Sequence, residues 1–275
     1  MIDVEWGTAT DCGLIRTVNE DSLLASPPVF LVADGMGGYQ AGDTASAIVV
    51  EEFTIAPGIE RVTPEWVMHS FDRADYRIRY GAGGGTTVAG IAVVQQDSNP
   101  YWLVFNIGDS RVYRCVQGRL TQVSVDHSVV QELVDEGKIA AESARFHPER
   151  HVITRAVGSS EPPHPDFWLL PAEVGERLLL CSDGLSSEVD EDDIAQTLAG
   201  FGTPHEIANA LVAQAISAGG RDNVTAIVVD VIAVGKDVLG EHIVTVDGVD
   251  PGVVDDATRP RIRTVQPMPG EGLPT

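Results

Sequence analysis

The sequence of 275 residues is long enough for one large hydrophobic core, and its content of 43% hydrophobic and 21% charged residues is that of an ordinary globular protein. A formal net charge of −23 excludes a typical nucleic-acid binder, because such proteins neutralise phosphates with Lys and Arg. No apolar run reaches the roughly 18 residues of a membrane helix, no leader peptide is recognisable, and three cysteines do not suggest a disulfide framework. We therefore predict a cytoplasmic protein with no nucleic-acid or membrane partner.

Apolar runs rich in Val, Ile and Thr predict strands. In chain order they are Phe30–Ala33, Thr86–Val94, Trp102–Ile107, Arg111–Val116, Arg177–Cys181 and Val224–Ile232. Short turns at Gln96–Asn99, Asp109–Ser110 and Gln117–Arg119 separate several of them. Because a parallel crossover needs about a dozen residues, strands joined by these turns are predicted to be antiparallel neighbours.

Helix-start residues such as Asp and Thr-Pro, and glycines that end a helical pattern, predict five helices. They run from Asp43 to Phe53, Thr63 to Arg79, Asp126 to Gly137, Asp190 to Gly200 and Thr203 to Gly219. Antiparallel strands with helices in separate blocks indicate an α+β fold with two antiparallel sheets at its centre. We expect one domain over residues 1–235 and a Pro- and Gly-rich, partly ordered tail over residues 236–275, with a short strand at His242–Val246.

Four aspartates stand at the ends of predicted strands. Asp34 follows FLVA, Asp183 follows LLLCS, Asp109 follows VFNIG, and Asp222 precedes VTAIVVD. Carboxylates brought together repel one another and lose hydration unless a cation holds them ionised, and oxygen-only ligands favour Mg²⁺ or Mn²⁺. The alternative for each single Asp-Gly is a simple turn; the repetition at strand ends favours a metal site.

Other chemistries lack their motifs. GAGGGTTVAG at residues 81–90 has no Lys for a phosphate-binding P-loop and is expected to enter a strand. DEDDI at residues 190–194 lacks the Gly and Glu of a calcium-binding EF-hand and is expected to form an acidic first helical turn. No G-x-S-x-G serine nucleophile occurs, and no Cys is followed six residues later by Arg, so a cysteine phosphatase is not supported.

Eight sequence blocks together resemble the metal-dependent type 2C Ser/Thr protein phosphatases, in their bacterial, compact form. The blocks occur in the family's order over roughly residues 5–232: RTVNEDS, VADGMGGYQAGDTAS, GTTV, NIGDSRVYR, DHSVVQELVDEG, ERHVITRAVG, LLLCSDGLS and GGRDNVTAIVVD. The resemblance implies a four-layer α/β/β/α sandwich with two central antiparallel sheets. It also implies two Mn²⁺ or Mg²⁺ ions at one end of the sandwich, with a third, weaker ion position.

The resemblance assigns the metal ligands residue by residue. Asp34 would bridge two ions, the Gly35 carbonyl would bind the second ion, Asp183 and Asp222 would complete the first, and Asp109 would hold the third. Three further residues would orient water molecules or neighbouring ligands as outer-shell groups: Glu20, Asp21 and Asn223.

The implied activity is hydrolysis of phosphoserine and phosphothreonine esters in proteins by a metal-bridging hydroxide, since divalent ions lower the pKa of water. Arg16 would clamp the phosphate, because a guanidinium matches two phosphate oxygens and stays charged. The expected partners are phosphoproteins made by a Ser/Thr kinase, with the phosphatase acting as a monomer.

Two positions depart from the family pattern. Tyr39 stands where bacterial relatives usually have His, a candidate acid for the leaving group, and Asp43 stands where Glu is frequent. No other histidine is marked as a replacement, and His127 is expected to be structural. Residues Val134–Pro148 would form a flap over the site.

Two other functions remain open at this point. One is a phosphatase-shaped binding or regulatory module with little turnover, and the other is a β-sandwich in which calcium only stabilises the fold.

Overall fold

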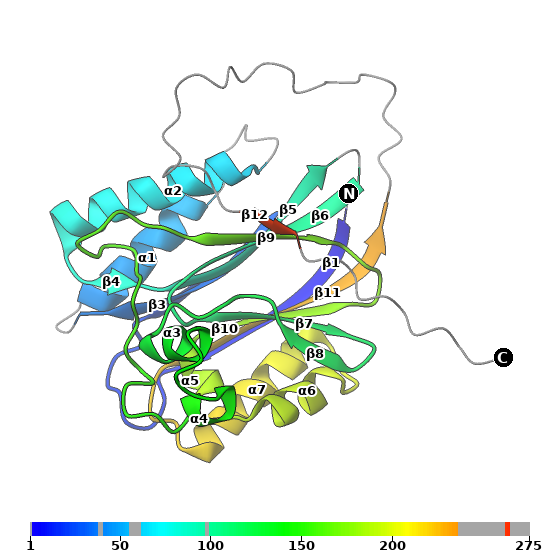
Figure 1. Ribbon diagram of the computed structural model, residues 1–275. Coiled ribbons are helices and arrows are strands. Elements are labelled where there is room, and N and C mark those ends of the chain that lie inside the picture. The colour runs from blue at the N-terminus through cyan, green and yellow to red at the C-terminus, as the bar shows by residue number, and fades with distance from the viewer. Residues whose placement is uncertain (1, 38–40, 55–61, 97–98, 236–261, 265–275) are drawn as a thin grey trace.

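The computed structural model describes residues 2–37, 41–54, 62–96, 99–235 and 262–264. Two sheets pack face to face, and helices cover the outer face of each one (Figure 1). Helices α1 and α2 lie on the larger sheet, whereas α6 and α7 lie on the smaller sheet. The predicted four-layer α/β/β/α architecture is therefore confirmed.

The larger sheet has seven strands, six of them in the order β12-β9-β6-β5-β3-β2, while β4 pairs separately with β3. Its strands are β2 Asp21–Ser26, β3 Val29–Met36, β4 Gly85–Thr86, β5 Val88–Gln96, β6 Asn99–Ile107, β9 Asp166–Pro171 and β12 Ile262–Thr264. All pairs are antiparallel except β12 with β9, which is parallel.

The smaller sheet has five antiparallel strands in the order β1-β11-β10-β7-β8. They are β1 Ile2–Asp11, β7 Arg111–Val116, β8 Arg119–Gln122, β10 Arg177–Cys181 and β11 Val224–Val234. The β7–β8 turn is closed by Gln117 and Gly118, which both have positive φ, as a tight hairpin requires. This turn confirms one of the predicted hairpins.

The helices are α1 Ala41–Phe53, α2 Pro64–Arg77, a π-helical turn η1 Ile78–Ala82, α3 Val129–Asp135, α4 Ala141–Ala144, α5 Asp183–Ser186, α6 Glu191–Leu198 and α7 Pro204–Ala218. Thr63 caps α2, and Thr203 forms a reciprocal capping box with Glu206 at the start of α7, as the Thr-Pro signals predicted.

Three hydrophobic cores separate the four layers. The first lies between α1, α2 and the larger sheet, where Phe53 packs on Phe71 and Phe105 with ring centroids 4.9 and 5.4 Å away. The second lies between the two sheets and includes the buried Trp102, and the third lies under α6 and α7. Burial of these apolar surfaces is the main stabilising contribution, and it fixes both sheets rigidly against each other.

Two predicted helix starts were wrong. Helix α1 begins at Ala41, so Asp43 lies in its first turn, where the Oδ1 atom accepts a hydrogen bond from the Thr44 amide at 2.7 Å. Helix α3 is capped by Ser128, whose hydroxyl accepts from the Gln131 amide. Asp126 instead forms an ion pair with Arg111 at 2.7 Å. For α3, the nearby Ser128 made the boundary ambiguous.

The predicted hairpin at Asp109–Ser110 was also wrong. Strands β6 and β7 flank this turn but belong to different sheets, so the chain crosses from one sheet to the other here. Gly108 takes a φ of +98°, and a Cβ atom at this position would lie 2.5 Å from the Thr87 side chain. A short connection therefore places Asp109 between the sheets rather than at the tip of a hairpin.

The predicted strand at His242–Val246 lies outside the described residues, as does most of the tail from residue 236. Within the described part of that tail, β12 adds a short parallel strand to the edge of the larger sheet beside β9. None of the helices among the described residues has the length and apolar content that a membrane span requires.

Candidate metal centre

The predicted carboxylates come from both sheets. Asp34 and Asp21 are direct cross-strand partners in β3 and β2 of the larger sheet, and β3 continues two residues beyond Asp34. At the smaller sheet, Asp183 opens the single-turn helix α5 one residue after β10, and Asp222 and Asn223 directly precede the neighbouring β11. Asp109 lies in the crossing between the sheets.

These carboxylates are close enough to affect one another's ionisation. Burial raises the pKa of Asp34 well above its ordinary value. The negative charges of four neighbours raise it further, namely Asp21, Asp183, Asp109 and Asp222. The aspartates that the sequence placed at strand ends therefore converge on Asp34.

The pKa values of two neighbouring carboxyl groups are also raised. Burial raises the pKa of Asp21 to about 7, even though the hydroxyl of Ser182 donates a hydrogen bond to Oδ2 of Asp21 at 2.8 Å. Its Oδ1 atom is buried with no hydrogen-bond partner among the described residues. Burial and the charge of Asp183 raise the pKa of Asp109 to about 8. A divalent cation would remove the cost of ionising such a cluster.

The donor set and the backbone around Asp34 fit a hard cation. The predicted ligands, which are four aspartate carboxylates and the Gly35 carbonyl, offer only oxygen atoms, and this is the ligand set that Mg²⁺ and Mn²⁺ prefer. At Gly35, a Cβ atom would lie 2.2 Å from the Gly42 carbonyl oxygen and 2.6 Å from that of Glu20, so only glycine fits here. Among the described residues, however, no three His, Cys, Asp or Glu side chains are already arranged closely enough to hold one ion.

The loop of residues 12–20 brings Arg16 to the cluster. Its Nη2 atom donates to Oδ2 of Asp222 at 2.7 Å, and half of the Arg16 side chain is exposed. The buried Asn223 holds this loop in place. Its amide nitrogen donates to the carbonyls of Cys12 and Val18 at 3.0 and 2.9 Å, and its Oδ1 atom accepts from the Glu20 amide at 2.9 Å.

Glu20 lies at the junction of this loop with β3 and α1. Its carbonyl accepts hydrogen bonds from the Gly35 amide at 3.2 Å and from the Ser46 hydroxyl at 2.6 Å. Its carboxylate reaches the start of α1, because a Cβ atom on Gly42 would lie 2.6 Å from Oε1 of Glu20. The three predicted outer-shell residues, Glu20, Asp21 and Asn223, therefore lie beside the converging aspartates.

The Asp109 crossing is anchored by His127. Nδ1 of His127 accepts a hydrogen bond from the Gly108 amide at 3.1 Å, and the His127 amide donates to the Gly108 carbonyl at 2.9 Å. The ring is buried. This contact agrees with the structural role that was expected of His127.

Sequence reasoning missed His151. Its Nδ1 atom lies 3.8 Å from Oδ2 of Asp183, and this carboxylate raises the pKa of His151. The residue belongs to the block ERHVITRAVG, but nothing in that string shows that it reaches a strand end some thirty residues later. Tyr39 lies outside the described residues. The predicted flap, Val134–Pro148, contains the end of α3 and all of α4, and Arg145 forms an ion pair with Asp190 at the start of α6.

Comparison with known proteins relates this arrangement to one family. The family model for protein phosphatase 2C matches residues 16–213. The serine/threonine protein phosphatase PstP of Mycobacterium tuberculosis is 36% identical over 247 residues, which cover 83% of this chain and 45% of PstP. The serine/threonine phosphatase stp of Listeria monocytogenes is 33% identical over 244 residues, covering 80% of this chain and 93% of that protein. This chain therefore spans about half the length of PstP.

Solved structures agree with the sequence comparison. A crystal structure of Mycobacterium tuberculosis PstP/Ppp matches 85% of this chain with a TM-score of 0.75 and 34% identity, and all of that structure is covered. The catalytic domain of PstP in complex with two manganese ions matches the same share of both chains with a TM-score of 0.73 and 34% identity. The chain belongs to the protein phosphatase 2C family.

Proposed function

We propose that this protein is a metal-dependent phosphatase that hydrolyses phosphoserine and phosphothreonine esters in proteins. The observation that carries the proposal is the convergence of Asp21, Asp109, Asp183 and Asp222 on Asp34, with Arg16 bonded to Asp222 at the rim. A cluster of this kind is costly in a folded protein unless it binds cations. The named activities of the bacterial relatives support the same conclusion.

Asp34, Asp183, Asp222 and the Gly35 carbonyl would hold two divalent ions, and Asp109 would contribute to a third position. Ions bound there would offset the charge of the phosphate and lower the pKa of water so that it becomes a nucleophile near neutral pH. The oxygen-only donors favour Mn²⁺ or Mg²⁺, and the manganese ions of the PstP structure support this choice.

Arg16 would bind the phosphate group of the substrate. One of its terminal nitrogens donates a hydrogen bond to Asp222, and because half of the side chain is exposed, its other N–H groups can donate to phosphate oxygens. Asn223 is a positioning residue for Arg16, because it fixes the loop at both Cys12 and Val18. Asp21 and Glu20 would accept hydrogen bonds from water in the site and so orient it.

The substrates would be proteins phosphorylated by a Ser/Thr kinase in the cytoplasm, and the enzyme would act as a monomer. Residues 1–235 would form the catalytic domain, with 236–275 as a tail that contributes β12 to its larger sheet. The positive field of Arg16 and the ions would select phosphorylated side chains over neutral esters.

The activity is tested with purified protein, millimolar Mn²⁺, p-nitrophenyl phosphate and a phosphothreonine peptide. We expect phosphate release from both substrates, loss of release in excess EDTA, and at least a hundredfold lower kcat in Asp34→Asn with the fold retained by circular dichroism. The exposed Asp72→Asn on α2 is the matched control and should keep its rate. Absence of phosphate release with Mn²⁺ or Mg²⁺ would refute the enzyme function and favour the binding module.

A further inference from the structure

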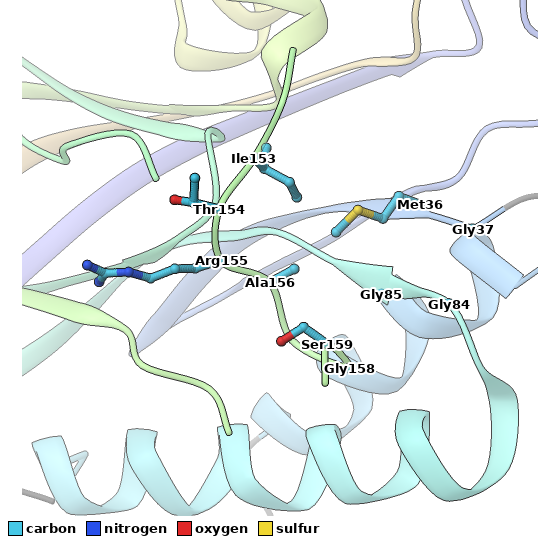
Figure 2. A pocket seen from close by; sticks show the side chains of 10 residues that line it. All are labelled: Met36, Gly37, Gly84, Gly85, Ile153, Thr154, Arg155, Ala156, Gly158 and Ser159. Carbon is cyan, nitrogen blue, oxygen red and sulfur yellow. The ribbon is translucent and has the colours of Figure 1, made fainter. Parts of the chain in front are cut away.

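A pocket with a volume of about 390 Å³ lies next to the candidate metal centre and is not used by the proposed chemistry. Met36 and Gly37 form one side of it, Gly85 contributes from β4, and Ile153, Ala156 and Ser159 form the opposite side (Figure 2). Met36 lies only two residues beyond Asp34 on β3. The pocket is therefore continuous with the end of the sheet that carries the carboxylates.

Strand geometry puts Met36 on the same face as Asp34. Side chains alternate along a strand, so residues i and i+2 point to one face and their Cα atoms are roughly 7 Å apart. Both residues are only partly buried, in contrast to the fully buried Val32 and Ala33. A group bound at Asp34 and a group bound against Met36 would thus be neighbours on one open surface.

The lining of this pocket is apolar and shaped by glycine. Figure 2 shows the side chains of Met36, Ile153 and Ala156 directed toward the same space. Met36 rests against Gly85, because a Cβ atom there would lie 3.3 Å from the Met36 methyl carbon. Any larger residue than glycine would narrow this space. The flexible thioether of Met36 can adapt to aliphatic groups of different shapes.

Two polar side chains at the edge of the pocket, Arg155 and Ser159, bind other partners. The guanidinium of Arg155 points away from Met36 in Figure 2 and reaches the His164 carbonyl and the Asp166 carboxylate, each at 3.4 Å. The Ser159 hydroxyl donates to the Glu161 carbonyl at 3.1 Å. Among the described residues that line the pocket, no side chain offers a free charge to a ligand between Met36 and Ile153, so this space favours an aliphatic group over a charged one.

We propose that this pocket, hereafter the Met36–Ile153 pocket, binds an aliphatic side chain of the phosphoprotein substrate within two residues of the phosphorylated residue. The inference rests on the proposed function and adds a sequence preference to it. Successive Cα atoms of an extended peptide are 3.8 Å apart, so one or two residues cover the distance between Asp34 and Met36. Burial of a Leu, Ile or Val side chain there would stabilise the bound substrate, and an Asp would lose hydration without a partner.

Phosphothreonine peptides test this preference. One set carries Leu, Asp or Lys at each of the two positions on either side of the phosphothreonine, in an otherwise Ala-rich sequence. We expect one of these positions to favour Leu over both Asp and Lys by about tenfold in kcat/KM, which is the size of effect that an apolar contact produces. p-Nitrophenyl phosphate, which has no flanking residues, reports the chemistry alone.

Ile153→Asp then tests whether the pocket is the origin of the preference. A carboxylate in its wall should reverse the order, so that the Lys peptide becomes better than the Leu peptide while turnover of p-nitrophenyl phosphate stays within twofold of wild type. Ile153 is only partly buried, and the milder Ile153→Ala should reduce the preference for Leu without reversing it. Val152→Asp is the matched control, because Val152 is the exposed neighbour and does not line the pocket.

The outcomes separate the two proposals. If wild-type protein hydrolyses p-nitrophenyl phosphate but treats the Leu, Asp and Lys peptides alike at every position, the pocket proposal is wrong and the phosphatase function stands. The same holds if Ile153→Asp and Val152→Asp change the preference equally. If no substrate releases phosphate, the proposed function itself fails.

Discussion

At the scale of single residues, the uncharged Asn223 is as important for the geometry of the site as the charged residues around it. Strand β3 holds Asp34 in the site, whereas Arg16 lies on an exposed loop that must be held in place by other contacts. Asn223 makes three hydrogen bonds to the backbone of that loop, at Cys12, Val18 and Glu20. A buried amide with two donors and one acceptor in use cannot be replaced by Asp or Leu without leaving a backbone group unpaired.

Asn223→Asp should therefore affect both stability and phosphate binding. The carboxylate cannot donate to the two carbonyls, and it adds a charge beside Asp222. We expect a loss of about 1–3 kcal/mol in the free energy of unfolding and a larger rise in KM than fall in kcat, since Arg16 becomes less well held. Urea unfolding and steady-state kinetics measure the two effects.

Asn209→Asp is a suitable control for this substitution. Asn209 is exposed on α7, where its amide donates to the His205 carbonyl within the same helix. Unfolding free energy and KM should both stay close to wild type. An equal loss in both variants, or an Asn223→Asp protein with unchanged KM, would contradict the positioning role.

The raised pKa values predict an unusual pH dependence for the metal-free protein. An unfolded Asp loses its proton near pH 3.9, whereas folded Asp21 and Asp109 hold theirs up to about pH 7 and 8. The folded state thus binds more protons in this interval, and the contribution of these groups to stability is lost as pH rises from about 4 to about 8.

Asp109→Asn removes part of this effect. In EDTA at pH 8 we expect the variant to exceed wild type in free energy of unfolding by on the order of 2 kcal/mol, with a difference near zero at pH 4. Millimolar Mn²⁺ should reduce or reverse the difference at pH 8. Urea titrations at the two pH values check it, with the exposed Asp72→Asn as control, and a variant that is less stable than wild type in EDTA at pH 8 would count against the like-charge cluster.

Sequence alone pointed to the aspartates that converge in the structure but not to their surroundings. Asp34, Asp109, Asp183 and Asp222 were identified because each stands beside an apolar run and a Gly or Asn. The approach of His151 to Asp183 was not predictable, since it depends on how a long loop without a periodic pattern folds back over the sheet.

At the scale of elements, the crossing between β6 and β7 is the connection that sequence reasoning misread. A short Gly-Asp-Ser turn between two apolar runs is typical of a hairpin, and only long-range packing directs the second strand to another sheet. Gly108 is the residue that permits this course, with its positive φ and its close approach to Thr87. The same packing delivers Asp109 to the other carboxylates.

Gly108→Ala should therefore lower the free energy of unfolding far more than Gly118→Ala does. Gly118 also has a positive φ, of 78°, but a Cβ atom there meets only the Ala199 side chain at 3.9 Å. Gly118→Ala should cost roughly 1–2 kcal/mol of backbone strain, and Gly108→Ala should cost at least about 2 kcal/mol more because of the contact with Thr87. Urea unfolding of the two variants measures the difference, and equal losses would show that crowding at Gly108 is relieved cheaply.

Strands that lie at sheet edges were the elements most often missed. Within the described part of the chain, β1 pairs with β11 alone and is partly exposed, and β2 has no fully buried residue. Their sequences lack the continuous apolar runs that marked β3, β10 and β11, because only one side of such a strand faces a core. The capped helices α2 and α7 were predicted well because Thr-Pro signals act locally.

At the scale of the whole molecule, two sheets with separate helix layers hold one cluster of carboxylates between them. Asp34 and Asp21 belong to strands of one sheet, whereas Asp183 follows β10 and Asp222 precedes β11 of the other, so the cluster exists only when the two sheets are packed. The inter-sheet core, with Trp102 and its neighbours, supplies the apolar burial that offsets the repulsion. The family relationship accounts for the common architecture, whereas the Met36–Ile153 pocket is inferred from the residues of this chain.

The most direct test of the central claim is X-ray diffraction from crystals soaked in Mn²⁺, with anomalous scattering measured at the manganese edge. We predict two strong peaks within about 2.5 Å of carboxylate oxygens of Asp34, Asp183 or Asp222, and a weaker third peak at Asp109. Crystals of Asp34→Asn soaked in the same way should lose at least one of the strong peaks. A wild-type map with no manganese in contact with Asp34 would contradict the assignment of this cluster as the metal centre.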